Sequence, residues 1–338
     1  MRYPVLFVAL AVPVSLAAQG LPATPSEPTA NEPATPNEIV ATAPASDWKR
    51  IAPEDLMVMD LAPDEAGRPR RVVIQLMPEP ISQGWVANIR ILAKAHWYDG
   101  NAVVRSQDNY VVQWGDPASD NETPDGKARG TPKPLPPGLI EVPEADYTTP
   151  LSAIKKGQTA DTPSAPRGDW QSRDAYAPLV EFHKGWPLGS DGSDGTDARV
   201  WPVHCYGHVG VGRNVSPDTG SGAELYAVIG HAPRQLDRNI AVVGRIIEGI
   251  EHLSALPRGT GPLSFYETPG ELVAIPTVRL GNEADGLPAY EYLDTSSASF
   301  ASYVDKRANR KDDFYIRPAG GVDICNAPVP VRRVGSRP

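Results

Sequence analysis

The residues best placed for chemistry are Arg105 and Gln113, which stand eight positions apart in the stretch Y-D-G-N-A-V-V-R-S-Q-D-N-Y-V-V-Q-W-G-D-P. Arginine is always charged and carries a planar fork of donors, so it suits electrostatic stabilisation of a reacting group. An Asp-Gly turn opens the stretch, and apolar runs on either side of the polar loop 106–109 predict two short strands. Side chains alternate between the two faces of a strand. The residues expected on one surface are Arg105, Tyr110, Val111 and Gln113.

Arg105 also has a simpler interpretation, since most arginines are exposed and a solvated arginine beside a core strand needs no chemistry. The order of the residues in this stretch favours a chemical role for Arg105 over this simpler interpretation. The stretch resembles the active-site segment of the cyclophilins, roughly Y-D-G-x-x-F-H-R-V-I-x-G-F-M-x-Q-G-G-D-P, and aligns with it without a gap. By this resemblance Arg105 falls on the catalytic arginine and Gln113 on the glutamine. Tyr110 and Val111 fall on two residues of the proline pocket.

The resemblance continues downstream. Gly212 and Arg213 fall on the last two residues of the family's Met-Ala-Asn strand. Glu224 and Tyr226 stand where the family has a glutamine and a phenylalanine, and Leu236 matches the leucine of the family's Leu-Asp pair before the next strand. These five residues complete the site that the resemblance implies.

The alignment also contains departures from the family pattern. Val103-Val104 replace Phe-His before the arginine, and Trp114 replaces a glycine after the glutamine. Gln235 stands where the family often has a tryptophan, and Ile240 lies close to the position of a family histidine. A shallower or more polar pocket would bind proline less well while leaving the arginine in place.

The resemblance covers 72–117 and 206–280, and it implies the fold. We expect an all-β-dominated chain with a closed, eight-stranded antiparallel barrel. Apolar residues at helical spacing predict a helix over Ser82–Ala95, and the family pattern implies another over Ile247–Leu256. These two helices are expected to cap the ends of the barrel.

The barrel domain is expected to span 47–285, interrupted by a long insertion at about 118–201 that is rich in Pro, Gly, Asp and Ser. A structureless loop of that length is improbable inside a compact domain. We therefore expect one or two short helices in it, packed against the barrel. A C-terminal extension, 286–338, follows and contains an amphipathic helix over Ser296–Arg310.

The function implied by the resemblance is peptidyl-prolyl cis-trans isomerisation without a cofactor. Arg105 would act near the imide nitrogen, Gln113 would bind the peptide backbone, and Glu224 would belong to the substrate-binding surface. Gly212 and Arg213 would present backbone to the substrate. The proline pocket would be lined by Tyr110, Val111, Tyr226 and Leu236. Two alternatives stay open: a barrel that binds proline-containing segments but turns over poorly, and an envelope-associated structural protein.

Composition and charge restrict the partners. The formal net charge is −9 and no run of Lys and Arg is present, which argues against nucleic acid as a partner. Residues 1–18 have the pattern of a cleaved secretory signal, and 19–46 read as a disordered Pro-rich linker. No apolar run is long enough to span a membrane. We expect a monomer that is periplasmic or secreted and acts on proline-containing segments of exported proteins.

Two cysteines and two histidines leave further alternatives. Cys205 and Cys325 are an even pair, which permits one disulfide in an oxidising compartment, with two buried free thiols as the alternative. His204 and His208 share a strand face, but a metal site needs a third ligand. A structural role is therefore favoured for both histidines, and no metal is expected.

Overall fold

The computed structural model describes 34–119, 127, 129–155, 168–193, 195, 197–312 and 314–335. The expected secretory signal and the first part of the expected linker lie outside the described residues. Over the part of the chain that is described, every helix is too short or too polar to cross a bilayer.

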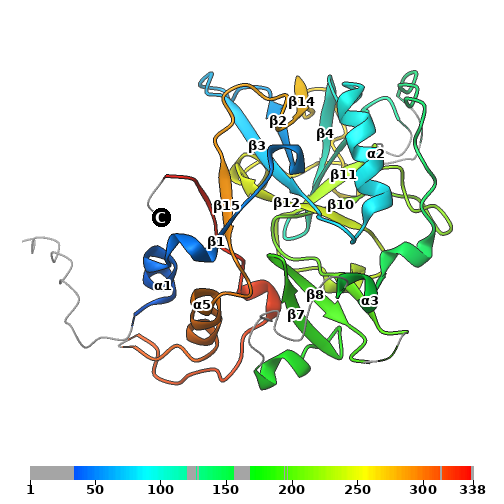
Figure 1. Cartoon of the computed structure of the whole chain (residues 1–338). Coiled ribbons are helices and arrows are strands. Elements are labelled where there is room, and N and C mark those ends of the chain that lie inside the picture. Colours follow the sequence, from blue (N-terminus) through cyan, green and yellow to red (C-terminus); the bar gives the residue numbers. More distant parts are fainter. Residues whose placement is uncertain are drawn as a thin grey trace, which may run out of the picture. The chain divides into compact units, whose positions relative to one another are not determined.

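The central element is a nine-stranded, nearly closed antiparallel sheet in the order β13-β4-β5-β11-β10-β12-β3-β2-β14 (Figure 1). The strands are β2 (Leu56–Leu61), β3 (Arg70–Leu76), β4 (Asn101–Ser106), β5 (Val111–Gly115), β10 (His208–Val211), β11 (Leu225–Val228), β12 (Val242–Glu248), β13 (Val273–Ile275) and β14 (Thr277–Leu280). The two outermost strands, β13 and β14, are consecutive in the chain and separated by Pro276, which cannot donate a ladder hydrogen bond. The Ala62 amide, just after β2, donates to the Ala274 carbonyl of β13 at 2.8 Å and so connects these two strands. The expected barrel is confirmed, and the ninth strand arises because one segment is broken at a proline.

Helix α2 (Gln83–Lys94) packs against the barrel, as the apolar spacing predicted. Trp85 and Ile89 of this helix are fully buried in the barrel core, and the Trp85 indole donates to the Thr219 carbonyl at 3.0 Å. The second expected helix is wrong in extent. Ile247 and Glu248 continue strand β12, and only the single turn α4 (Glu251–Ser254) is helical.

The insertion forms a second sheet of four strands in the order β6-β9-β8-β7, which the sequence did not predict. Its elements are β6 (Thr149–Pro150), α3 (Leu151–Ile154), β7 (Leu179–His183), β8 (Trp186–Ser190) and β9 (Arg199–Pro202). Neighbouring side chains of β9 pack into two different hydrophobic cores. Val200 packs in the interior of the barrel, whereas Trp201 packs against the C-terminal extension. The insertion sheet therefore lies between the barrel and the extension.

The extension pairs with β1, in the N-terminal part of the described chain, in a three-stranded sheet of order β1-β15-β16. The three strands are β1 (Trp48–Arg50), β15 (Tyr290–Leu293) and β16 (Val331–Arg333), and helix α5 (Ala298–Ala308) lies between β15 and β16 in the chain. The expected linker is wrong at its end, because Pro36–Thr42 forms helix α1, capped by Thr35 and Glu38 and packed beside α5. Short 3-10 turns are η1 (Ala45–Asp47), η2 (Pro53–Asp55), η4 (Glu144–Tyr147), η5 (Asp169–Ser172), η6 (Arg234–Leu236), η7 (Pro262–Ser264) and η8 (Ile324–Asn326).

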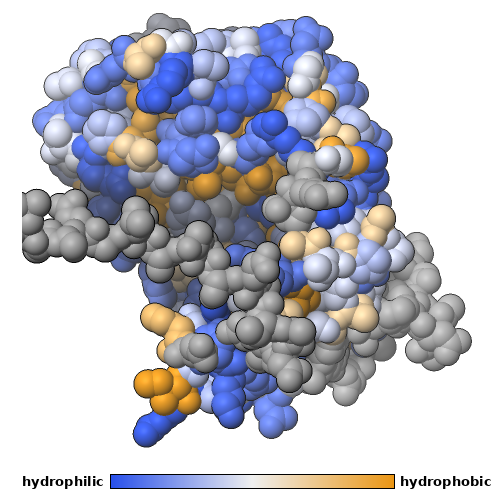
Figure 2. Space-filling model, turned by 90° about the vertical axis from the view of Figure 1, so that its left-hand side faces the viewer, coloured by the Kyte–Doolittle hydropathy of each residue, from blue (hydrophilic) through white to orange (hydrophobic). Residues whose placement is uncertain are grey.

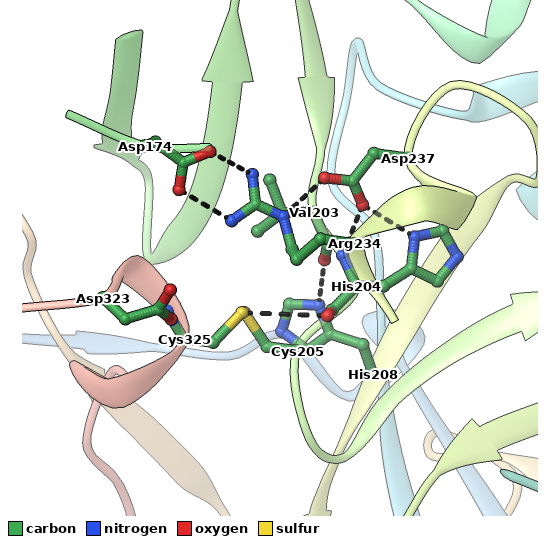
Figure 3. The surroundings of a disulfide bond; sticks show 9 residues. All are labelled: Asp174, Val203, His204, Cys205, His208, Arg234, Asp237, Asp323 and Cys325. Atoms are coloured by element: carbon green, nitrogen blue, oxygen red, sulfur yellow. Dashed lines mark hydrogen bonds and ion pairs between the residues drawn. A yellow bond between two sulfur atoms is a disulfide. The ribbon is translucent and has the colours of Figure 1, made fainter. Parts of the chain in front are cut away.

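A disulfide joins Cys205, just before β10, to Cys325 in η8 of the extension (Figure 3). Of the two alternatives for the cysteines, the structure has the bonded one. The face of the molecule in Figure 2 is mainly hydrophilic, with apolar side chains in small separate groups. The large apolar side chains are concentrated in the barrel core and in the core shared by the insertion and the extension.

Candidate active site

Arg105 and Gln113 are brought face to face by a bulge in β4. Val103 pairs with Trp114 in β5, but the register then shifts, so Arg105 rather than Val104 stands opposite Gln113. A bulge re-aims the side chains that follow it. Val103 and Trp114 point into the barrel core, whereas Arg105 and Gln113 lie on the outer face.

The Arg105 guanidinium is held on several sides. Nε donates to the Leu263 carbonyl at 2.8 Å, Nη1 donates to Gln113 Oε1 at 3.3 Å, and Nη2 donates to the Gln107 side chain. The aromatic rings of Tyr110 and Phe265 lie 5.8 and 5.2 Å from its Cζ. The planar charged group is thus held by hydrogen bonds within reach of two aromatic rings, while the residue stays half-buried.

The loop 257–266 supplies contacts that sequence reasoning missed. The Tyr266 amide donates to Val104 O at 2.7 Å and the Gly259 amide donates to Ser106 O at 3.0 Å, which fastens the loop along β4. Phe265 pairs with Arg105 in an isolated bridge. The only available signal was a lone phenylalanine in a Gly-, Pro- and Ser-rich segment.

A polar row extends from Arg105 across the neighbouring strands. Gln113 is 8% exposed, and its amide donates to Glu224 Oε2 at 3.5 Å. Glu224 lies directly over Gly212, where a Cβ atom would come within 2.7 Å of the carboxylate. The Gly212 amide donates to the Glu224 carbonyl at 3.0 Å. Four residues that the sequence proposed, from β4 to the end of β10, are therefore contiguous.

Beside this row lies an apolar cluster formed by Tyr110, Val111, Tyr226, Val228 and Ile240. Val111, Tyr226 and Val228 are 3%, 5% and 0% exposed, so only Tyr110 and Ile240 offer open surface. Leu236, the fourth residue expected here, instead lies half-buried in the turn η6, and the Ile240 amide donates to its carbonyl at 3.1 Å. Burial raises the pKa of the Tyr226 hydroxyl well above its usual value, and this hydroxyl is 2.8 Å from His204 Nε2.

Arg213 is turned away from this row. Its guanidinium donates to the Asn239 carbonyl at 3.0 and 2.9 Å and to the Asn214 carbonyl at 2.6 Å. It borders a groove of about 350 Å³ that Glu224 also lines. Further residues that line this groove are Trp97, Asp116, Lys133, Gly212, Asp218 and Ser221.

The two histidines have separate hydrogen-bond partners. His208 donates from Nδ1 to the Val203 carbonyl at 2.6 Å, and complete burial lowers its pKa to about 3. His204 bonds to Tyr226 and to Asp237. Within the described ranges, no three His, Cys, Asp or Glu side chains are grouped as metal ligands would be.

Comparison with known proteins finds a family model that matches this chain. Residues 65–277 match the family model described as cyclophilin type peptidyl-prolyl cis-trans isomerase/CLD, which is more than half of the chain. A crystal structure of the cyclophilin AquaCyp293 from Hirschia baltica is similar with a TM-score of 0.55 and 18% identity, covering 86% of this chain and 95% of that one. A Cryptosporidium parvum cyclophilin type isomerase, crystallised with the dipeptide Ala-Pro, has a TM-score of 0.34 and 10% identity, covering 67% and 97%. No curated protein matches.

Proposed function

The chain belongs to the cyclophilin-type peptidyl-prolyl cis-trans isomerases, and we propose that it catalyses rotation of X–Pro bonds on the surface around Arg105 and Gln113. The observation that carries this proposal is the Arg105 guanidinium, which is fixed by Leu263 and Gln113 on the outer face of β4 and β5. A charge held in place by the fold costs no reorganisation when a substrate reacts.

The chemistry required is modest. Rotation about an X–Pro bond must break amide resonance, which gives a barrier of about 20 kcal/mol. In the rotated state the imide nitrogen becomes pyramidal and carries a lone pair. A guanidinium N–H that donates to this lone pair stabilises the rotated state more than the planar one, which lowers the barrier. Arg105 has this role in the proposal.

Substrate binding uses the groups on either side of Arg105. Gln113 and Glu224 offer polar atoms to the peptide backbone, and the proline ring rests on the open surface of Tyr110 and Ile240. The chain that precedes the proline continues toward the groove that Glu224 lines, and the groove volume of about 350 Å³ accommodates a side chain.

A second candidate function is the capture of proline-containing segments with little turnover. One observation favours it: Val111 and Tyr226 are 3% and 5% exposed, so the apolar cluster is covered more than a deep proline pocket would be. Weak binding of the proline ring would leave the ring poorly placed beneath Arg105. The two candidate functions predict the same ligand but different rates of X–Pro isomerisation.

A protease-coupled isomerisation assay on Ala-X-Pro-Phe peptides separates them. For the enzyme, kcat/KM falls at least about tenfold in Arg105→Ala, since a charge-assisted hydrogen bond of about 1.5–3 kcal/mol is lost. Arg50→Ala, which removes an exposed arginine of β1, serves as the matched control and retains the parent rate. Background rates in the parent, with peptide binding still detectable, would support capture without turnover.

The proposed place of action is the periplasm or the exterior, with exported proteins as substrates. Residues 1–18 have the pattern of a secretory signal, and the Cys205–Cys325 disulfide is of a kind that persists in oxidising compartments. Fractionation of a Gram-negative host that expresses the full chain tests this. We expect a periplasmic product whose measured mass corresponds to a chain that begins near Gln19. An uncleaved cytoplasmic product would contradict this proposal.

A further inference from the structure

The hydroxyl of Tyr226 is an unusual group to find in the apolar cluster of the candidate site. The Tyr226 ring packs with Val111 and Val228, whose side chains cannot accept a hydrogen bond. A buried hydroxyl without a partner is costly, and it would be satisfied by turning toward water or substrate. The position of this hydroxyl therefore decides whether the cluster presents an apolar surface.

The structure directs the Tyr226 hydroxyl over β10. Gly210 stands opposite Tyr226 in the sheet, and a Cβ atom at Gly210 would lie 2.3 Å from the hydroxyl oxygen. The glycine thus leaves the space that the phenol occupies. At the end of this space, His204 Nε2 lies 2.8 Å from the hydroxyl oxygen, and the two rings are nearly parallel at 8°.

Asp237 determines which nitrogen of His204 carries the proton. Its Oδ1 accepts from the His204 backbone amide and from Nδ1, both at 2.9 Å. A carboxylate can only accept, so Nδ1 carries a proton, and Nε2 is the nitrogen that faces the Tyr226 hydroxyl. In the neutral imidazole, the hydroxyl is the donor to Nε2.

Asp237 is itself held by Arg234 and Asp174 (Figure 3). Arg234 Nε donates to Asp237 Oδ2 at 2.6 Å, and its two terminal nitrogens donate to Asp174 at 2.9 and 3.0 Å. These side chains are 2–6% exposed. Burial by itself lowers the pKa of Arg234, but the bonds to Asp174 and Asp237 outweigh it, so the pKa is raised and the charge persists. Planar, bidentate pairing of this kind fixes the geometry of both partners.

The segments outside the barrel contribute to this network. Asp174 comes from the insertion, between η5 and β7. Cys205, next to His204, is bonded to the extension through Cys325, whose sulfur lies 3.7 Å from the His204 carbonyl oxygen. The insertion and the extension thus both reach the backbone or the partners of His204.

We propose that His204 and Asp237 are positioning residues for the isomerase site, because they hold the Tyr226 hydroxyl over Gly210 and so keep it out of the apolar cluster on which the proline rests. This inference rests on the proposed function. Without His204 as acceptor, the hydroxyl would seek another partner and tilt the phenol into the cluster. The need for His204 then depends on the hydroxyl and disappears when the hydroxyl is removed.

Four proteins test the proposal: the parent, His204→Asn, Tyr226→Phe and the double variant. Asparagine can still donate to Asp237 but cannot reach Tyr226, so it removes only the acceptor. In His204→Asn we expect kcat/KM to fall about tenfold, the effect of an unpaired buried hydroxyl. In the Tyr226→Phe background, the same His204→Asn exchange should change kcat/KM by less than about threefold relative to Tyr226→Phe itself. His252→Asn, the same exchange in α4, is the matched control.

Suppression of the His204→Asn loss by Tyr226→Phe is the supporting result. A merely structural His204 would give the same loss in both backgrounds, and that outcome, or no loss at all, would overturn the proposal. Urea unfolding of each variant separates folding from activity, and His204→Gln takes the place of His204→Asn should the latter not fold. If the parent itself shows no isomerisation, the proposed function fails. The inference is then judged by the Kd of an Ala-Pro peptide in an NMR titration, which should follow the same pattern.

Discussion

The Cys205–Cys325 disulfide should contribute several kcal/mol to stability, since it closes a loop of 120 residues. The chain-entropy relation gives about 5 kcal/mol for a loop of this length, and measured values are commonly about 2–4 kcal/mol. Cys205 is buried and Cys325 half-buried in the core shared by the insertion sheet, α5 and η8, so the bond joins segments that already pack together. We therefore expect a loss of about 2–5 kcal/mol when the disulfide is removed.

Urea unfolding followed by tryptophan fluorescence measures this loss. With an m-value of about 3 kcal/mol/M, the midpoint of the parent should fall by roughly 0.7–1.7 M when a reductant is added. The double variant Cys205→Ala/Cys325→Ala should show a similar low midpoint and no response to the reductant. A midpoint that changes by less than about 0.3 M in the reduced parent would refute the reasoning, because the loop would then already be constrained in the unfolded chain.

Three further predictions concern the surroundings of the site. Gly210→Ala should lower kcat/KM about fivefold or more, because the new methyl group displaces the Tyr226 ring at an overpacking cost of about 1–3 kcal/mol; an unchanged rate would contradict the placement of the ring. The pKa of His208 is lowered to about 3 by burial, below its unfolded value of about 6.5, so its contribution to stability is present above pH 6.5 and is lost as the pH falls toward 3. His208→Asn should therefore show a smaller fall in the urea midpoint between pH 7 and 4.5 than the parent, and an equal fall would count against this. Cyclosporin A should bind weakly, since Gln235 stands where the family often has a tryptophan, and a tight complex in calorimetry would be inconsistent with that.

The barrel could be predicted because the sequence resembles a known family over most of its strands, and α2 because its apolar residues have helical spacing. The helix that the family pattern implied over Ile247–Leu256 was wrong in extent, because the first residues of this segment continue strand β12. The tertiary structure decides for the strand: the Glu248 carboxylate accepts from the Tyr290 hydroxyl at 3.0 Å and from Arg333. Both partners belong to the extension, far away in the sequence.

Helix α1 shows the opposite failure, in which a local signal was present and composition masked it. Thr35, Pro36 and Glu38 form an N-terminal capping box with proline in the first turn. The surrounding proline-rich composition predicted a linker instead. A helix of seven residues is too short to be stable alone, so its contact with α5 supplies the missing stability.

The candidate site was predicted in its strands and missed in its loops. Alternation along β4 and β5 identified Arg105 and Gln113 as neighbours, although the bulge that aligns them leaves no sequence signal. Phe265 is 160 residues from Arg105 in the chain, and no local pattern connects them. His204 was assigned a structural role because a metal site would need a third ligand. Its partners Asp237 and Tyr226 come together only in the folded chain.

The measurement that tests the central claim most directly is NMR exchange spectroscopy of an Ala-Pro peptide with the parent and with Arg105→Lys. Lysine keeps the charge but lacks the planar fork that bonds to Gln113 and Leu263 together. We predict that the parent accelerates cis–trans exchange, and that in Arg105→Lys the exchange rate falls at least about tenfold while the peptide Kd changes less than about threefold. An exchange rate in the variant equal to that of the parent would contradict the assignment of Arg105 as the catalytic residue.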